Sequence, residues 1–151
     1  MLTAHSNGAI RAWDGFTGAS IHSLTTPDAP AFPPPPPGVW VDDPTPPPHQ
    51  REVYVLDAHP TLPHVVVSAG YDGQALLWDV VENRLLQTLP MDKLQVDDDS
   101  EFIEGKWSAD GTVLALGDVG GRIALCGISL GASDASAQRA PDAVALAGAT
   151  A

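Results

Sequence analysis

Three residues of this chain, His49, Ser68 and Asp72, are of the types that form hydrolytic triads. In such a triad the serine hydroxyl attacks a carbonyl, the histidine takes its proton, and the carboxylate orients the imidazole. The sequence around Ser68 is VVSAG, which lacks a nucleophile-elbow pattern, and no oxyanion-hole pattern accompanies it. If these groups are buried with the indole of Trp78, each needs a hydrogen-bond partner, and a linked network supplies one. The residues therefore favour a structural network over catalysis.

Other candidate sites are weaker. Asp57, His59 and His64 flank a turn, where they could act as a base or ligate a metal, but His59 ends a predicted strand and suits a capping role. Asp97 to Asp99 lack the alternating spacing and the glycine of a calcium loop. The single cysteine, Cys126, lies in an apolar strand, which indicates packing. We expect no catalytic residue, no cofactor and no metal ion, and no enzyme activity.

The charge of the chain opposes nucleic-acid binding. Its 151 residues carry 7 basic and 19 acidic side chains, a formal net charge of -12, whereas a grip on phosphates needs Lys and Arg. No segment has the apolar length of a membrane span, and the first residues do not look like a secretory signal. One cysteine excludes an intramolecular disulfide and fits a reducing compartment. We expect a soluble intracellular protein that binds neither nucleic acid nor membrane.

The elements that would position these residues are short strands. Val65 to Val67 and Ala75 to Leu77 are apolar and β-rich, and the turn Tyr71 to Gly73 separates them. A strand beginning at Val53 precedes them and another, Leu85 to Leu89, follows. Four antiparallel strands make one small sheet that cannot hide both faces alone, so it needs neighbours.

Two internal copies of this pattern supply such neighbours. Upstream, the residues in the spacing of Ser68, Asp72, Gly73 and Trp78 are Thr3, Asn7, Gly8 and Trp13. Downstream, residues 102–128 repeat the first three strands, and the tryptophan position falls on Leu125 or Cys126. Self-similarity near forty residues indicates a propeller or an array.

These motifs resemble WD-repeat β-propellers. Tyr71-Asp72-Gly73 and Trp78-Asp79 stand where blades of that family carry a turn aspartate and a Trp-Asp pair. The resemblance implies a buried hydrogen-bonded tetrad, formed here by His49, Ser68, Asp72 and Trp78. Pro48 departs from the family pattern, which has glycine before the histidine.

For the first blade the resemblance implies only a partial tetrad, formed by Thr3, Asn7 and Trp13. Asn7 replaces the aspartate, and without a first strand no histidine is expected there. That network is therefore predicted to be incomplete.

More narrowly, the chain resembles the WD-repeat region of bromodomain and WD repeat-containing proteins. The residues that suggest it are His59-Pro60, Ser68-Ala69-Gly70 and Asp118-Val119-Gly120. The resemblance implies a nuclear, chromatin-linked scaffold that regulates transcription through other proteins. It also suggests a substrate receptor of a cullin-type ubiquitin ligase, although Phe16 and Val81 stand where such receptors often carry arginine. No bromodomain is present, so acetyl-lysine recognition is not carried over.

The predicted fold class is all-β, a partial propeller of about two and a half four-stranded blades. Its segments are an incomplete blade at 1–24, a proline-rich insertion at 25–48, a complete blade at 49–90, an acidic loop at 91–101, a degenerate blade at 102–128 and a disordered tail at 129–151. A closed propeller needs at least four blades. We therefore expect the remaining blades from a longer chain or, alternatively, missing strands from another chain.

The insertion holds eleven of the fifteen prolines and favours an extended, solvated path. Its candidate partner-binding residues, by likeness to ligands of proline-reading domains, are Phe32, Pro33, Pro34, Pro35, Pro36 and Trp40. The plainer interpretation is a low-complexity insert. The functional hypotheses are therefore a protein-binding scaffold, a proline-rich peptide ligand or, less favoured, an enzyme built on a propeller.

Overall fold

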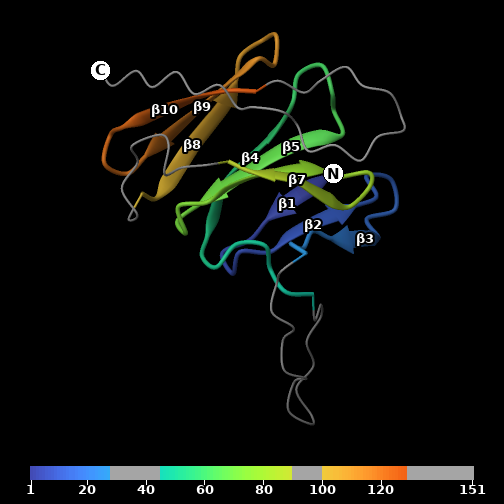
Figure 1. Cartoon of the computed structure of the whole chain (residues 1–151). Coiled ribbons are helices and arrows are strands. Elements are labelled where there is room, and N and C mark those ends of the chain that lie inside the picture. Colours follow the sequence, from blue (N-terminus) through green and yellow to red (C-terminus); the bar gives the residue numbers. More distant parts are fainter. Residues whose placement is uncertain (28–44, 90–99, 129–151) are drawn as a thin grey trace.

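The computed structural model describes residues 1–27, 45–89 and 100–128, which form three antiparallel β-sheets side by side (Figure 1). In chain order the strands are β1 (Leu2–Ala4), β2 (Ile10–Trp13), β3 (Ser20–Ser23), β4 (Val53–Ala58), β5 (Val65–Gly70), β6 (Ala75–Asp79), β7 (Arg84–Thr88), β8 (Phe102–Trp107), β9 (Val113–Asp118) and β10 (Ile123–Gly127). The first sheet is ordered β1-β2-β3, the middle sheet β4-β5-β6-β7 and the third β10-β9-β8. Within these ranges there is no helix, and hence none that could cross a membrane.

The middle sheet is covered on both faces. All six residues of β5 are buried, as its run of apolar residues around one hydroxyl predicts. Toward the third sheet, Val67 and Leu77 join a core that includes Leu116 of β9. Toward the first sheet, Trp78 packs with Ile10 of β2 and its neighbours. The two faces of one four-stranded sheet thus supply one side of each hydrophobic core, which accounts for the stacking of the three sheets.

The sheets meet through their first strands. β4 lies beside both β1 and β8. Gly105 in β8 permits the approach to β4, because a Cβ there would lie 2.5 Å from Cγ1 of Val55. Gly8 plays a similar part in the turn after β1. It has φ +84°, and a Cβ there would lie 2.0 Å from the carbonyl oxygen of His49.

The predicted fold class is confirmed: the described chain is all-β, with sheets of three, four and three strands. The predicted strands lie on the observed ones, although β5 continues three residues beyond the predicted Val67, to Gly70. Most of the predicted proline-rich insertion and acidic loop, and the whole predicted tail, lie outside the described residues. Those three predictions, and the segment boundaries that depend on them, stay predictions.

Candidate functional site

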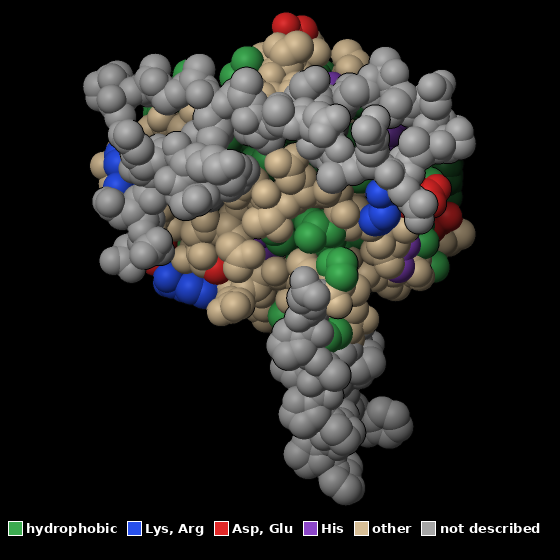
Figure 2. All heavy atoms as spheres, in the orientation of Figure 1, with side chains coloured by type: hydrophobic (Ala, Val, Ile, Leu, Met, Phe, Trp, Pro, Cys, Tyr) green, Lys and Arg blue, Asp and Glu red, His purple; other side chains and the backbone are tan. Residues whose placement is uncertain are grey.

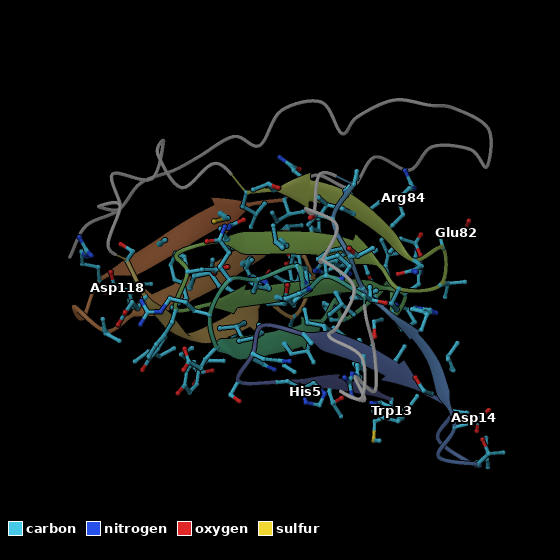
Figure 3. All side chains as sticks on the ribbon, turned by 90° about the horizontal axis from the view of Figure 1, so that it is seen from below. His5, Trp13, Asp14, Glu82, Arg84 and Asp118 are labelled. Atoms are coloured by element: carbon cyan, nitrogen blue, oxygen red, sulfur yellow. The ribbon has the colours of Figure 1, made fainter. Side chains whose placement is uncertain are left out.

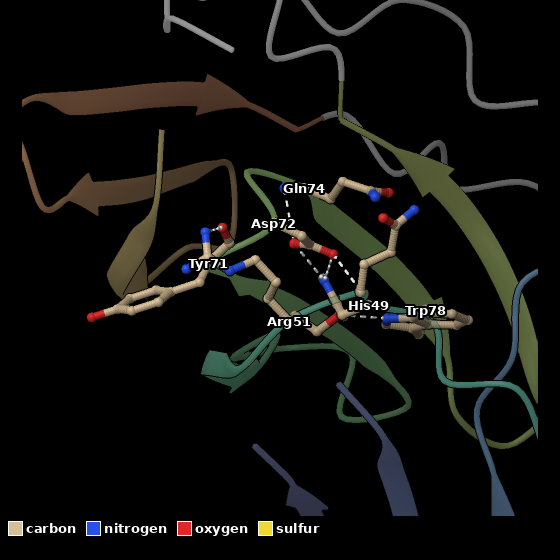
Figure 4. A network of polar contacts seen from close by, with 8 residues as sticks. His49, Arg51, Tyr71, Asp72, Gln74 and Trp78 are labelled. Carbon is tan, nitrogen blue, oxygen red and sulfur yellow. Dashed lines mark hydrogen bonds and ion pairs between the residues drawn. The ribbon is translucent and has the colours of Figure 1, made fainter. Parts of the chain in front are cut away.

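The middle sheet carries a buried chain of hydrogen bonds (Figure 4). Nε1 of Trp78 in β6 donates to Oγ of Ser68 in β5, over 2.8 Å. The same Oγ lies 2.8 Å from Nε2 of His49, which precedes β4. Nδ1 of His49 lies 3.0 Å from both carboxylate oxygens of Asp72, in the turn between β5 and β6. The structure therefore brings together all four residues that the WD-repeat resemblance implies.

The directions of these bonds follow from the donors available. The indole nitrogen can only donate, so the Ser68 hydroxyl accepts from Trp78 and has its own proton free for His49. Nε2 of His49 then accepts and Nδ1–H donates to Asp72. Every polar group of the network is satisfied in this arrangement, as buried polar groups require.

Asp72 also fixes the backbone around the histidine. Its carboxylate accepts hydrogen bonds from the amides of Gln50, at 3.0 Å, and Gln74, at 3.2 Å. Burial alone would raise the pKa of Asp72, but the hydrogen bonds that its carboxylate accepts from His49 and the two amides outweigh burial and hold this pKa below its ordinary value. The carboxylate is thus kept ionised as an acceptor that joins the entry of β4 to the β5–β6 turn.

The same three residue types would make a Ser-His-Asp triad, and the distances alone would allow it. The environment does not favour that role. Ser68 and His49 are fully buried, and the Ser68 oxygen is already the acceptor for Trp78. A substrate carbonyl cannot reach this oxygen while the sheets stay packed, so the network is built to hold strands together.

In the first sheet a shorter network forms, and it includes a residue that the sequence did not indicate. Nε1 of Trp13 donates to Oγ1 of Thr3 over 2.8 Å, and Nε2 of His5 lies 3.0 Å from the same hydroxyl. His5 follows β1 and does not precede a first strand, so it is not the tetrad histidine, whose predicted absence from this blade is not contradicted. Asn7 does not join this hydrogen-bond network; its side-chain Oδ1 accepts from the backbone amide of Ala9. Figure 3 shows His5 and Trp13 on the side of the first sheet that faces away from the middle sheet.

Position 5 corresponds to Gly70 of the middle sheet, where a Cβ would lie 2.2 Å from the carbonyl oxygen of Glu52. Beside β1, the described residues contain no segment equivalent to the one before β4, so a histidine side chain fits. The only signal in the sequence is the spacing of His5, two residues after the predicted hydroxyl at Thr3.

In the third sheet, packing groups replace the tryptophan and serine of the polar network. Trp78 pairs with Val66 across the middle sheet, and in the same register Cys126 pairs with Leu114. Of the two predicted alternatives for the tryptophan position, the structure selects Cys126. This thiol is buried against Leu116, and burial raises its pKa to about 11. It is a packing group.

His59 joins the middle and third sheets. It is buried, its Nδ1 accepts from the amide of Leu62 at 3.2 Å, and its Nε2 donates to the carbonyl of Gly111 at 3.0 Å. Its ring meets the edge of Trp107 with 4.7 Å between ring centres. His59 has the capping role that the sequence suggested. It also contacts the third sheet, which the sequence did not suggest.

In the described part of the chain, no three metal-ligating side chains gather at one place. Figure 2 shows the Lys and Arg side chains of the face in view in separate places, without a continuous basic patch. The candidate partner-binding residues Phe32, Pro33 to Pro36 and Trp40 lie outside the described residues.

Comparison with known proteins bears on the fold. The chain matches no known family model. Among solved structures it is similar to the C-terminal WD40 domain of Sif2, with a TM-score of 0.57 and 20% sequence identity. The match covers 83% of this chain and 27% of that one, so the chain spans about a quarter of the length of its structural neighbour. The described residues therefore have the fold of part of a WD40-type β-propeller.

Proposed function

We propose that this chain is part of a protein–protein interaction scaffold and performs no catalysis itself. The observation that carries this proposal is that the polar network of the middle sheet is buried and holds strands together. Its histidine, serine and tryptophan are buried and bonded to one another, so they stabilise blades and offer nothing to a substrate. What the described residues present outward are turns and strand edges, and the WD40 fold typically uses these as binding surfaces.

The turns include apolar side chains that the fold does not need. Phe16 in the β2–β3 turn and Val81 in the β6–β7 turn are both exposed. The aspartates Asp14 and Asp79 close these two turns in the same way, each through its Oδ1 and two backbone amides. Exposed apolar residues on rigid turns are suited to contacts with other proteins.

The finer proposal is a nuclear, chromatin-associated regulator of transcription, with the remaining blades in a longer chain. It is supported by the resemblance of His59-Pro60, Ser68-Ala69-Gly70 and Asp118-Val119-Gly120 to bromodomain and WD repeat-containing proteins. The alternative, a substrate receptor of a cullin-type ubiquitin ligase, has less support, because Phe16 and Val81 occupy the positions where such receptors often carry arginine.

The proposal is tested by expressing the full chain in eukaryotic cells with a photo-crosslinking residue in place of Phe16 or Val81. We expect light-dependent crosslinks to chromatin proteins and recovery of the chain in the chromatin fraction. A Trp78→Ala variant is the control, because it opens the buried network and should abolish crosslinks that depend on the folded sheet. Absence of any light-dependent partner at either position would contradict the scaffold, and crosslinks to ligase adaptors in place of chromatin proteins would favour the alternative.

A further inference from the structure

Two exposed side chains mark equivalent places in the middle and third sheets. The register of β4 against β5 shifts between Val53 and Val55, and that of β8 against β9 shifts between Phe102 and Glu104. The residues at these bulges, Tyr54 and Ile103, are 55% and 42% exposed. A β-bulge redirects a side chain, and here it turns a large apolar residue outward from the first strand of each sheet.

The turn beside each bulge adds a second apolar residue. The amide of Tyr71 donates to the carbonyl of Glu52, and the amide of Val119 donates to that of Glu101, both over 2.9 Å. Tyr71 stacks on Tyr54 with 4.6 Å between ring centres and 30° between planes. Val119 is 50% exposed. Two different sequences thus place an apolar pair at the same position, although Tyr71 is half-buried whereas Val119 is exposed.

The two pairs belong to one surface because an arginine connects them. Nη1 of Arg51 lies 2.6 Å from Oε1 of Glu101, just before β8, and 3.0 Å from the carbonyl oxygen of Tyr71, just after β5. The guanidinium carbon is 5.4 Å from the centre of the Tyr71 ring, an arrangement visible in Figure 4. We call Tyr54, Tyr71, Ile103 and Val119 the tyrosine surface.

The rim of the tyrosine surface is acidic. Arg51 is neutralised by Glu101, and within the described ranges no cation pairs with Glu52 or Glu104. Partial burial raises the pKa of Tyr71, and Tyr54, Glu101 and Glu52 raise it further. The carboxylates of Glu52 and Glu104 favour an approaching cation at this rim.

We propose that the tyrosine surface binds an extended segment of another protein that carries arginine or lysine between apolar side chains. Its cation would lie against the exposed Tyr54 ring, near Glu52 and Glu104, as cation–π contacts and charge complementarity favour. Its apolar side chains would cover Ile103 and Val119. This inference deepens the proposed function by naming a face and a class of partner, and it rests on that function.

The test is fluorescence anisotropy of the full chain with a short labelled peptide that alternates arginine, leucine and glycine. We expect binding that Tyr54→Ser and Ile103→Ser each weaken at least about fivefold, since each removes one half of the contact. A peptide with glutamate in place of arginine should not bind. A benzophenone on the arginine peptide should crosslink to the beginnings of β4 and β8, which locates the site even if a variant folds poorly.

Matched controls separate a specific site from the attraction of any basic peptide to an acidic protein. Ile21→Ser, in β3, removes an exposed apolar residue, and Glu82→Gln removes one negative charge, as Glu52→Gln does at the tyrosine surface. Figure 3 shows Asp14 and Glu82 far from Asp118, which adjoins Val119. We expect Glu52→Gln to weaken binding and both controls to leave it unchanged.

Failure of the wild-type chain to bind the arginine peptide would overturn this inference, as would equal weakening by Ile21→Ser and Tyr54→Ser. If either occurs while photo-crosslinks at Phe16 or Val81 persist, only the tyrosine surface is wrong. If those crosslinks are also absent, the scaffold proposal falls with it.

Discussion

At the scale of single residues, Ser68 is tightly constrained in the middle sheet. Its one hydroxyl oxygen accepts from Trp78 and lies in hydrogen-bond contact with His49, both at 2.8 Å, and all three residues are fully buried. Removing the hydroxyl leaves two buried polar groups without their partner and gives neither a route to water.

We therefore expect Ser68→Ala to lower the free energy of unfolding by about 1 to 3 kcal/mol, because an indole N–H and an imidazole nitrogen become unsatisfied. Urea unfolding followed by tryptophan fluorescence measures this. Ser20→Ala, at an exposed position of β3, is the control and should change stability by less than about 0.5 kcal/mol. A Ser68→Ala change as small as that of the control would mean that the network does not hold the sheet.

Asp72 gives this network a pH dependence of known sign. Its pKa in the folded chain is held below 3.8, so the unfolded chain takes up the proton first as pH falls. The stability that this carboxylate contributes is fully present above the unfolded-state pKa and is lost as pH falls through the folded-state pKa.

We expect Asp72→Asn to lower stability at neutral pH and to make stability less dependent on pH below 3.8. Urea midpoints measured across that acid range test this. Glu82→Gln, in an exposed turn, should leave the wild-type slope unchanged. An identical slope in Asp72→Asn and wild type would show that this carboxylate is not held ionised by the fold.

At the scale of elements, the β8–β9 turn is fitted around a side chain from another sheet. Gly111 has φ +74°, and a Cβ there would lie 2.2 Å from Cε1 of His59. Gly121, in the β9–β10 turn, has nearly the same φ, +77°, with nothing within 4 Å of its Cβ position. Comparing alanine substitutions at the two glycines therefore separates two costs: the strain of a left-handed backbone and the loss of the contact between sheets.

We expect Gly121→Ala to cost about 1 kcal/mol from backbone strain alone. Gly111→Ala should cost at least about 1 kcal/mol more, because its methyl group displaces His59. In a His59→Ala background this difference should shrink, as a double-mutant cycle would show. Equal costs for the two alanines in the wild-type background would mean that the turn does not rest on the imidazole.

The sequence predicted the strands better than the contacts between sheets. Short apolar, β-rich runs and turn glycines predicted the strands and their antiparallel order, because both are local properties. The bulges at Tyr54 and Ile103 were not predicted, since an extra residue in a strand leaves no mark in composition. His5 was missed because its place depends on what lies beside β1, and the tetrad residues came from a family resemblance, not from spacing alone.

At the scale of the whole molecule, apolar packing holds the middle and third sheets together. Leu116 is buried in the core between them, whereas Lys106 and Asp57 form an exposed ion pair at 3.1 Å across the same junction. Burial of a leucine stabilises far more than an exposed ion pair.

We expect Leu116→Ala to cost about 2 to 5 kcal/mol and Lys106→Ala less than about 1 kcal/mol. Equilibrium unfolding in urea compares the two, with the salt concentration held constant. A larger loss in Lys106→Ala would mean that charge, and not the shared core, joins these sheets.

Native-state amide hydrogen exchange of the full chain tests most directly whether the three sheets are stacked with the middle one covered on both faces. We predict the slowest exchange in β5 and β6, which lie at the centre of both cores, and fast exchange in β3, whose first residues are exposed. Exchange in β5 and β6 as fast as in β3 would contradict the stacked propeller and every proposal built on it.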